Sequence, residues 1–132
     1  MIGRIDHIGI AVKNIDNALK LYSSMFGLKT GEIITLAEQG LKIGFMKIGD
    51  TKLEFLESLS QDSPISKFID KRGEGIHHIC LQVDDIEETL KKLAAAGIEL
   101  IDKKPRPGAH GEKIAFIHPK STGGVLIELC ER

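Results

Sequence analysis

The chain has 132 residues, of which 18 are basic and 19 acidic, so its formal net charge is −1 at pH 7. This length allows one compact domain with a core of its own, and we expect residues 1–132 to form a single domain. No basic patch interleaved with aromatic residues occurs, which argues against nucleic-acid binding, and no apolar run is long enough to cross a membrane. The N-terminus leads directly into a strand pattern rather than a signal peptide, so we expect a cytoplasmic protein.

The first half of the chain predicts a strand, a helix, three more strands and a short helix. Alternating apolar residues predict a strand over residues 5–12, followed by a helix that Asn14 or Asp16 caps and that ends at Gly27. The later strands and the short helix are expected over residues 29–36, 41–48, 52–57 and 65–70. Glycine and charged residues over 71–75 predict a linker to the second half.

The second half repeats this order. A strand is expected over residues 76–83, and a helix capped by Asp84 or Asp85 is expected to end at Gly97. Proline and glycine make residues 105–111 a predicted loop. The remaining strands are expected over residues 98–102, 113–118 and 125–130.

The chain contains two cysteines, and neither belongs to a CxxC motif. Cys80 and Cys130 both lie in apolar strand patterns. We therefore predict two buried free thiols rather than a redox or zinc site.

The two halves are copies of one pattern. The segment IDHIGIAV at residues 5–12 is echoed by IHHICLQV at residues 76–83, which places a histidine at the same strand position 71 residues later. Each half reads β-α-β-β-β and its last strands carry a glutamate, so we divide the chain into repeat modules 1–72 and 73–132. The repeated residues of ligand type are His7, Glu54, His78 and Glu128.

Two imidazoles and two carboxylates suit a divalent cation such as cobalt, zinc, manganese, nickel or iron. A single strand histidine is more often a hydrogen-bonded core residue, and a single strand glutamate usually faces solvent. The duplicated placement favours metal ligation for all four residues. Protein ligands of this kind leave coordination positions open for substrate oxygens, as a Lewis-acid catalyst requires.

Other polar residues have simpler interpretations. His77 adjoins His78 but points to the opposite face of the strand, so we interpret it as structural. His110 and His118 suit either the surface or the rim of a substrate site. The basic residues Lys103, Lys104 and Arg106 form a solvated run, yet they adjoin a glycine-rich loop that could meet a phosphate-bearing ligand.

Several motifs resemble the vicinal oxygen chelate superfamily, which includes glyoxalases, bleomycin resistance proteins and dioxygenases. They are DHIGIAV at residues 6–12, GIHHI at 75–79, and HPK followed by GVLIEL at 118–129. The EQG turn at residues 38–40 brings the chain nearest to the methylmalonyl-CoA epimerases within that superfamily. The resemblance covers essentially the whole chain. It implies an α+β fold in which two paired βαβββ modules form a curved mixed sheet around a metal site.

The resemblance also implies a site and a reaction. The metal ligands would be His7, Glu54, His78 and Glu128, with cobalt the first candidate ion and zinc, manganese and nickel as alternatives. The substrate would be a branched malonyl-CoA thioester whose α-proton is removed and returned through an enolate. In some bacterial epimerases a catalytic glutamate stands three residues after the EQG turn, where this chain has Ile43, so Glu128 and Glu54 become the candidate catalytic residues. The likeness further implies a homodimer.

Three alternatives use the same scaffold. A glyoxalase I-type enzyme, which forms lactoylglutathione, would accept the same four ligands. A non-catalytic protein that binds a small molecule is the second alternative, and retention of all four residues argues against it. An iron dioxygenase is the third, although its two histidines and one carboxylate leave Glu54 without a role.

Overall fold

The computed structural model describes residues 2–132. These residues fall into two compact units. We call residues 7–77 the N-terminal unit, and residues 2–6 together with 78–132 the C-terminal unit. Both combine a sheet with covering helices, which confirms the predicted α+β class. Among the described residues, no helix has the length and apolar character needed to cross a membrane.

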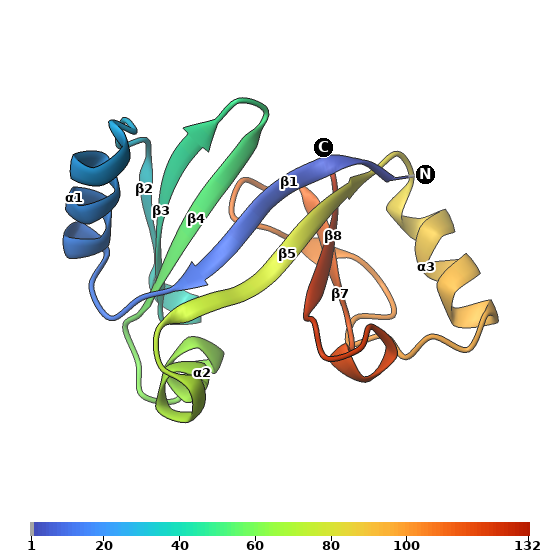
Figure 1. The fold of residues 1–132 in the computed structure, drawn as a ribbon. Coiled ribbons are helices and arrows are strands. Elements are labelled where there is room, and N and C mark those ends of the chain that lie inside the picture. The colour runs from blue at the N-terminus through green and yellow to red at the C-terminus, as the bar shows by residue number, and fades with distance from the viewer. Residues whose placement is uncertain (1) are drawn as a thin grey trace. The chain divides into compact units, whose positions relative to one another are not determined.

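The N-terminal unit is built on strands in the order β2-β3-β4-β1 (Figure 1). Strand β1 runs parallel to β4, whereas β2, β3 and β4 are joined antiparallel. The elements that contribute to this unit are β1 (Ile2–Ala11), α1 (Ile15–Phe26), β2 (Ile33–Leu36), β3 (Leu41–Ile48), β4 (Thr51–Ser58) and α2 (Pro64–Arg72). The short 3₁₀ helix Ala37–Gln39 joins β2 to β3.

Helix α1 covers one face of this sheet. Ile15 and Leu19 of the helix are buried against apolar residues of β1, β3 and β4, including fully buried Phe55. Gly44 allows the close approach, because a Cβ there would lie 3.0 Å from Cγ2 of Ile15. The Asn14 side chain accepts a hydrogen bond from the Asn17 N–H at 2.9 Å, which confirms one of the two predicted caps.

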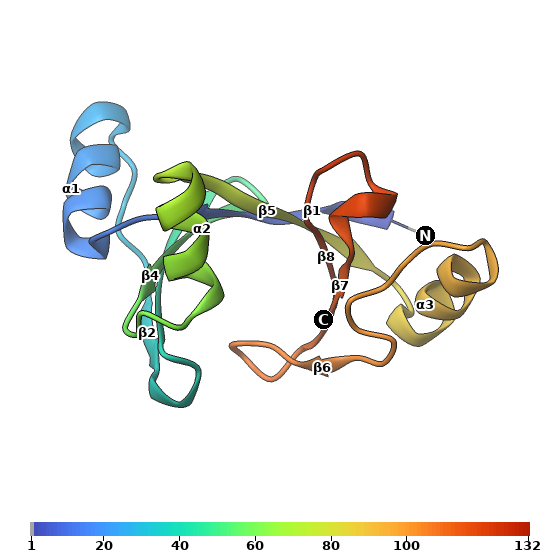
Figure 2. The ribbon, with the colours of Figure 1, turned by 90° about the horizontal axis from the view of Figure 1, so that it is seen from below.

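The C-terminal unit has the strand order β5-β8-β7-β6, with residues 2–6 of β1 beside β5. Strand β5 is parallel to β8, and β6, β7 and β8 are antiparallel. Its elements are β5 (Gly75–Val83), α3 (Ile86–Ala95), β6 (Arg106–Pro107), β7 (Lys113–Ile117) and β8 (Ile127–Glu131), together with the 3₁₀ helix Pro119–Ser121. Figure 2 shows α3 beside the loop that carries β6.

Apolar clusters of strand and helix residues form the core of this unit. Helix α3 packs through Ile86 and Leu90 against β7 and β8. A second cluster contains Cys80, Ile114 and Cys130. Both cysteines are free and buried, as the sequence predicts.

Each unit ties the start of its helix to its last strand. The Ile15 N–H donates to Glu57 Oε1 at 2.8 Å, and the Ile86 N–H donates to Glu131 Oε1 at 2.9 Å. Asp85 adds an N-cap to α3 by accepting from the Glu88 N–H at 3.0 Å. These bonds satisfy backbone donors that the first turn of a helix leaves free.

Several predicted boundaries are wrong. The strand expected over residues 29–36 begins only at Ile33, although backbone bonds already join Gly31 and Glu32 to Phe45. The strand expected over residues 98–102 is reduced to one bridge between Leu100 and Ile117, because the next two N–H groups converge on the Phe116 carbonyl. The expected linker 71–75 is shared between the end of α2 and the start of β5. The expected loop 105–111 contains the short strand β6. The last strand, expected over residues 125–130, spans Ile127–Glu131.

Candidate functional site

The N-terminal unit contains a buried histidine–glutamate pair. His7 Nδ1 lies 3.0 Å from Glu54 Oε2, and their side chains are only 4% and 10% exposed. Parallel pairing of β1 with β4 places Gly9 opposite Glu54. His7 therefore lies two residues before Gly9, the strand neighbour of Glu54. Residues two apart on a strand share a face, and Gly9 leaves that face open.

The C-terminal unit repeats this arrangement. His78 Nε2 lies 3.0 Å from Glu128 Oε1, with side chains 5% and 7% exposed. Parallel pairing of β5 with β8 places Cys80 opposite Glu128, again two residues after the histidine. The two pairs therefore have the same strand register, as the sequence repeat predicts.

The donor atoms of each pair fit a shared cation. A separation of 3.0 Å is that of a hydrogen bond between imidazole and carboxylate. Two ligands at a right angle, each about 2.1 Å from one divalent ion, also lie about 3.0 Å apart. Buried carboxylates require a proton, a cation or a hydrogen-bond donor, because burial penalises their charge. Each unit thus offers one nitrogen and one oxygen ligand.

A phenylalanine accompanies each glutamate. Phe45 is the cross-strand neighbour of Glu54, and Phe116 is the neighbour of Glu128. The Phe116 ring packs edge-on against His78, with ring centroids 5.6 Å apart. Apolar rings beside the polar pairs keep the local dielectric low, which strengthens electrostatic interactions there.

A basic side chain lies near each of these phenylalanine rings. Lys52 Nζ lies 5.9 Å from the Phe45 ring centroid, and the Arg106 guanidinium carbon lies 5.3 Å from that of Phe116. Cations within about 6 Å of an aromatic face are attracted by the ring quadrupole. The duplication therefore extends from the ligand pairs to their phenylalanine neighbours, whereas the two basic residues come from strands that are not equivalent, β4 and β6.

The position three residues after the EQG turn holds a buried aliphatic residue. Ile43 is 5% exposed and pairs with Leu56, and the equivalent Ile114 is 8% exposed and pairs with Cys130. Neither side chain can transfer a proton. The roles of Glu54 and Glu128 in catalysis remain predictions.

The other histidines have local roles. His77 packs edge-on against Phe68 in the N-terminal unit, with ring centroids 5.1 Å apart. His118 Nδ1 accepts from the Lys120 N–H at 3.0 Å and caps the short helix that follows. The His110 N–H donates to Glu112 Oε1 at 2.8 Å.

Sequence reasoning missed a buried ion pair in the C-terminal unit. Asp6 is fully buried, and Arg132 donates to it twice, from Nε to Oδ1 at 2.7 Å and from Nη2 to Oδ2 at 3.0 Å. This bonding raises the pKa of Arg132 above its usual value. The only signal in the sequence was an acidic residue inside an apolar strand.

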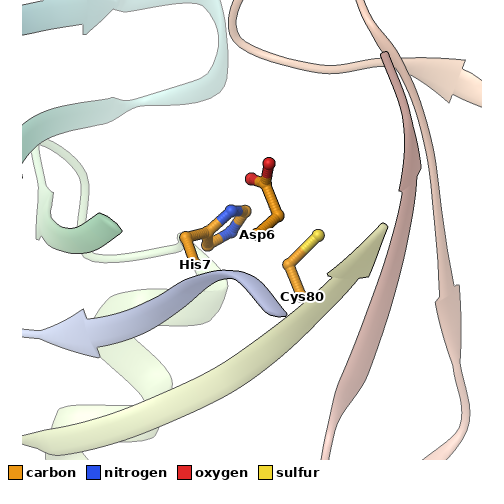
Figure 3. A group of neighbouring side chains, drawn as sticks. All are labelled: Asp6, His7 and Cys80. Atoms are coloured by element: carbon orange, nitrogen blue, oxygen red, sulfur yellow. The ribbon is translucent and has the colours of Figure 1, made fainter. Parts of the chain in front are cut away.

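Cys80 lies near this ion pair. In Figure 3, which also draws the adjoining His7, the side chains of Asp6 and Cys80 project from the same side of β1 and β5. A hydrogen bond with Cys130, burial and the negative charges of Glu128 and Asp6 all raise the pKa of the Cys80 thiol. Cys80 is therefore an inert neutral thiol at physiological pH.

Comparisons with known proteins agree with the fold. The family model for the glyoxalase/bleomycin resistance protein/dioxygenase superfamily matches residues 6–116. The chain is 45% identical to the uncharacterised protein YqjC of Bacillus subtilis, over 98% of this chain and 93% of that one. It is 42% identical to the mitochondrial methylmalonyl-CoA epimerase of Dictyostelium discoideum, over 99% of this chain and 80% of the relative.

A solved structure gives the same result. The chain aligns with a variant of Streptomyces coelicolor methylmalonyl-CoA epimerase in complex with 2-nitronate-propionyl-CoA, with a TM-score of 0.94 and 34% identity. That alignment covers 99% of this chain and 95% of the other. The duplicated strand-helix pattern, the matching family model and these relatives lead to one conclusion: the chain belongs to the glyoxalase/bleomycin resistance protein/dioxygenase superfamily, with methylmalonyl-CoA epimerases among its relatives.

Proposed function

We propose that this protein is a methylmalonyl-CoA epimerase that holds a divalent cation through two histidine–glutamate pairs. The observation that carries the proposal is the repetition of one buried pair, His7 with Glu54 and His78 with Glu128, at 3.0 Å in each unit. Relatives and a structural neighbour with this activity support the choice of substrate. Cobalt is the first candidate ion, and zinc, manganese and nickel have suitable ligand preferences.

The cation and the two carboxylate residues would have different roles in the reaction. The cation would supply Lewis-acid stabilisation for negative charge that develops on the thioester oxygen. One carboxylate, Glu54 or Glu128, takes the proton from the carbon between the thioester and the carboxylate, and the electron pair of that C–H bond moves into the thioester carbonyl. The other residue, in its carboxylic acid form, donates its proton to the opposite face of the same carbon and becomes a carboxylate, and proton exchange with solvent then restores the starting protonation of both residues. No net oxidation occurs, and the stereocentre is inverted.

The surroundings of the pairs suit this chemistry. His7 and Glu54 are almost fully buried, as are His78 and Glu128, so few water molecules compete for charge. Phe116 fixes the His78 ring from its edge. A homodimer belongs to the same proposal on the family likeness alone, and the cytoplasmic location expected from the sequence belongs to it as well.

Solvent exchange tests the proposed reaction. The cobalt-loaded protein is incubated with methylmalonyl-CoA in D₂O, and loss of the α-proton signal is followed by NMR. We expect exchange that stops when the cation is chelated and resumes when it is restored. Absence of exchange would contradict the proposal, and formation of lactoylglutathione from the glutathione hemithioacetal would identify a glyoxalase instead.

A further inference from the structure

A lysine lies beside the ligand pair of the N-terminal unit. Parallel pairing of β1 with β4 makes Lys52 the direct strand partner of His7. Glu54 follows Lys52 by two residues on β4, so the side chains of both residues lie on the same face of the sheet. Lys52 Nζ lies 5.9 Å from the ring centroid of Phe45, the cross-strand neighbour of Glu54, which agrees with this orientation. Lys52 therefore shares the face of the sheet that carries His7 and Glu54.

The ammonium group of Lys52 has no anionic partner in the described part of the chain. No carboxylate among residues 2–132 forms an ion pair with it, and its charge lies near the Phe45 ring instead. Lys52 is half-buried, beside ligand residues that are almost fully buried. Because screening by water is weaker there than at the surface, an anion that reaches this ammonium group is held more strongly than at an exposed lysine.

A second lysine also indicates an anion at this position. Antiparallel pairing of β3 with β4 places Lys47 directly opposite Lys52. Like charges at opposed strand positions destabilise a sheet. Lys47 is exposed, and within residues 2–132 no carboxylate forms an ion pair with it either. Two uncompensated cations on neighbouring strands are unfavourable for the fold alone, whereas they favour the binding of an anion between them.

The lysine beside the ligand pair occurs in only one copy of the repeat. Since Glu54 and Glu128 are equivalent, the residue equivalent to Lys52 is Leu126, two positions before the second glutamate. Leu126 also lies beside the histidine strand of its unit, because its carbonyl accepts the Ile79 N–H at 3.2 Å. The repeat thus keeps the ligand pair in both units but adds a cation in only one. A substrate whose two oxygen-bearing groups differ in charge would be oriented by this difference.

The anion that fits this position is a carboxylate of the acyl group. A 2-carboxyacyl thioester has a negative carboxylate and a neutral thioester carbonyl on the same carbon. An ammonium group has three N–H donors and forms charge-assisted hydrogen bonds with a carboxylate. The phosphates of a CoA ester are remote from its acyl end, so a cation beside a proposed ligand of the reaction centre is placed for the carboxylate rather than for the phosphates.

We propose that Lys52 binds the carboxylate of the acyl group and makes the protein specific for 2-carboxyacyl thioesters over uncharged acyl thioesters. This inference rests on the proposed function for the class of substrate. Lys52 also favours removal of the α-proton, because the enolate adds a second negative charge to the same acyl group. Lys52 takes no part in the transfer of the proton itself. Lys47, at the exposed end of the same hairpin, adds to the positive potential.

Binding of two thioesters to the cobalt-loaded protein tests this specificity. Calorimetry compares methylmalonyl-CoA with propionyl-CoA, which has the same carrier but no carboxylate. The variant is Lys52→Met, which keeps an apolar side chain near Phe45. We expect its affinity for methylmalonyl-CoA to fall at least about tenfold, because a charge-assisted hydrogen bond is lost, and its affinity for propionyl-CoA to stay within about twofold of the wild type.

Two further variants serve as controls. Lys52→Arg keeps the charge and should restore most of the affinity for methylmalonyl-CoA. Lys20→Met removes an exposed lysine from α1, which packs on the opposite face of the sheet, and should bind both thioesters like the wild type. Affinity for Co²⁺ should not fall in Lys52→Met, because an ammonium group repels a cation. A fall would show that Lys52 acts through the cation, and it would overturn the assignment.

The remaining outcomes separate this proposal from the proposed function. Equal losses of affinity for both thioesters, or no loss for either, would overturn the assignment of Lys52. If the wild type exchanges the α-proton while Lys52→Met binds methylmalonyl-CoA normally, only the role of the lysine is refuted. If the wild type neither binds methylmalonyl-CoA nor exchanges its α-proton, the proposed function is refuted, and the carboxylate assignment with it.

Discussion

His78 Nε2 lies 3.0 Å from Glu128 Oε1 inside the C-terminal unit, and the histidine precedes the strand partner of that glutamate by two residues. His7 and Glu54 have the same separation and the same register in the N-terminal unit. If these histidine–glutamate contacts were only structural hydrogen bonds, each unit would need one only where its own fold requires it. Their repetition in both copies, through Nδ1 of His7 and Nε2 of His78, is better explained by a common function, which the proposed cation provides.

Loss of one anionic ligand should weaken cation binding. In Glu128→Gln and Glu54→Gln, we expect affinity for Co²⁺ to fall at least about 100-fold, since an amide oxygen is neutral and a poorer ligand. Competition with a chromophoric chelator measures the affinity. Glu38→Gln is the matched control, because this residue lies outside both pairs in the short helix Ala37–Gln39. Unchanged affinity in both pair variants would exclude ligation by these carboxylates.

The helix contact of Glu131 should affect stability without affecting the cation. Glu131→Ala removes the acceptor of the Ile86 N–H, and we expect the free energy of unfolding to fall by about 1 kcal/mol. Urea denaturation of the metal-free protein measures this change. Affinity for Co²⁺ should stay at the wild-type value, because residues three apart on a strand face opposite sides of the sheet. A large loss of metal affinity would instead place Glu131 in the site.

Asp6 and Arg132, which form a buried ion pair, should contribute to stability cooperatively. Asp6→Leu leaves the Arg132 guanidinium with only the more distant Glu112 carboxylate, at 3.4 Å, and we expect a loss of about 3 kcal/mol in the free energy of unfolding. The double variant Asp6→Leu/Arg132→Leu should recover part of that loss, since the guanidinium is removed together with its buried partner. Denaturant unfolding of the wild type and three variants, with Arg132→Leu completing the cycle, gives the coupling energy. Simple additivity of the two single changes would show that the pair contributes nothing specific.

The buried Cys80 thiol should make the free energy of unfolding decline at alkaline pH. The pKa of Cys80 is raised in the native protein, above the value near 8.5 expected for an unfolded cysteine. Above about pH 8.5 the unfolded chain binds fewer protons than the native one, so the free energy of unfolding falls as pH rises, by up to about 1.4 kcal/mol per pH unit for one proton.

Comparison with Cys80→Ala/Cys130→Ala isolates this effect from the ionisation of lysine and tyrosine. The decline between pH 8.5 and 10 should be shallower in the double variant, as measured by urea unfolding at each pH. In the native wild type we also expect slow reaction with iodoacetamide, because both thiols are buried. Identical slopes in the two proteins would show that the native thiols ionise as freely as the unfolded ones.

Local patterns determined most of the secondary structure. The alternation around Ile10 and the cap at Asn14 identified β1 and α1, because strand and helix periodicities differ and capping requires only neighbouring residues. The secondary-structure predictions failed where the residue pattern was typical of a strand but no ladder of backbone hydrogen bonds formed. Residues 98–102 alternate like a strand, yet only Leu100 finds a bridge partner, since strand formation depends on hydrogen bonds from elsewhere in the chain.

The chemical types and the repetition of the candidate site can be read from the amino-acid order, because a duplication preserves strand positions such as those of His7 and His78. Which atoms come into contact depends on the three-dimensional fold. The parallel register of β5 with β8 brings Glu128 to His78, and the salt bridge from Arg132 to Asp6 joins residues 126 positions apart. No local pattern encodes such contacts, since they depend on how strands pair and which side chains are then buried together.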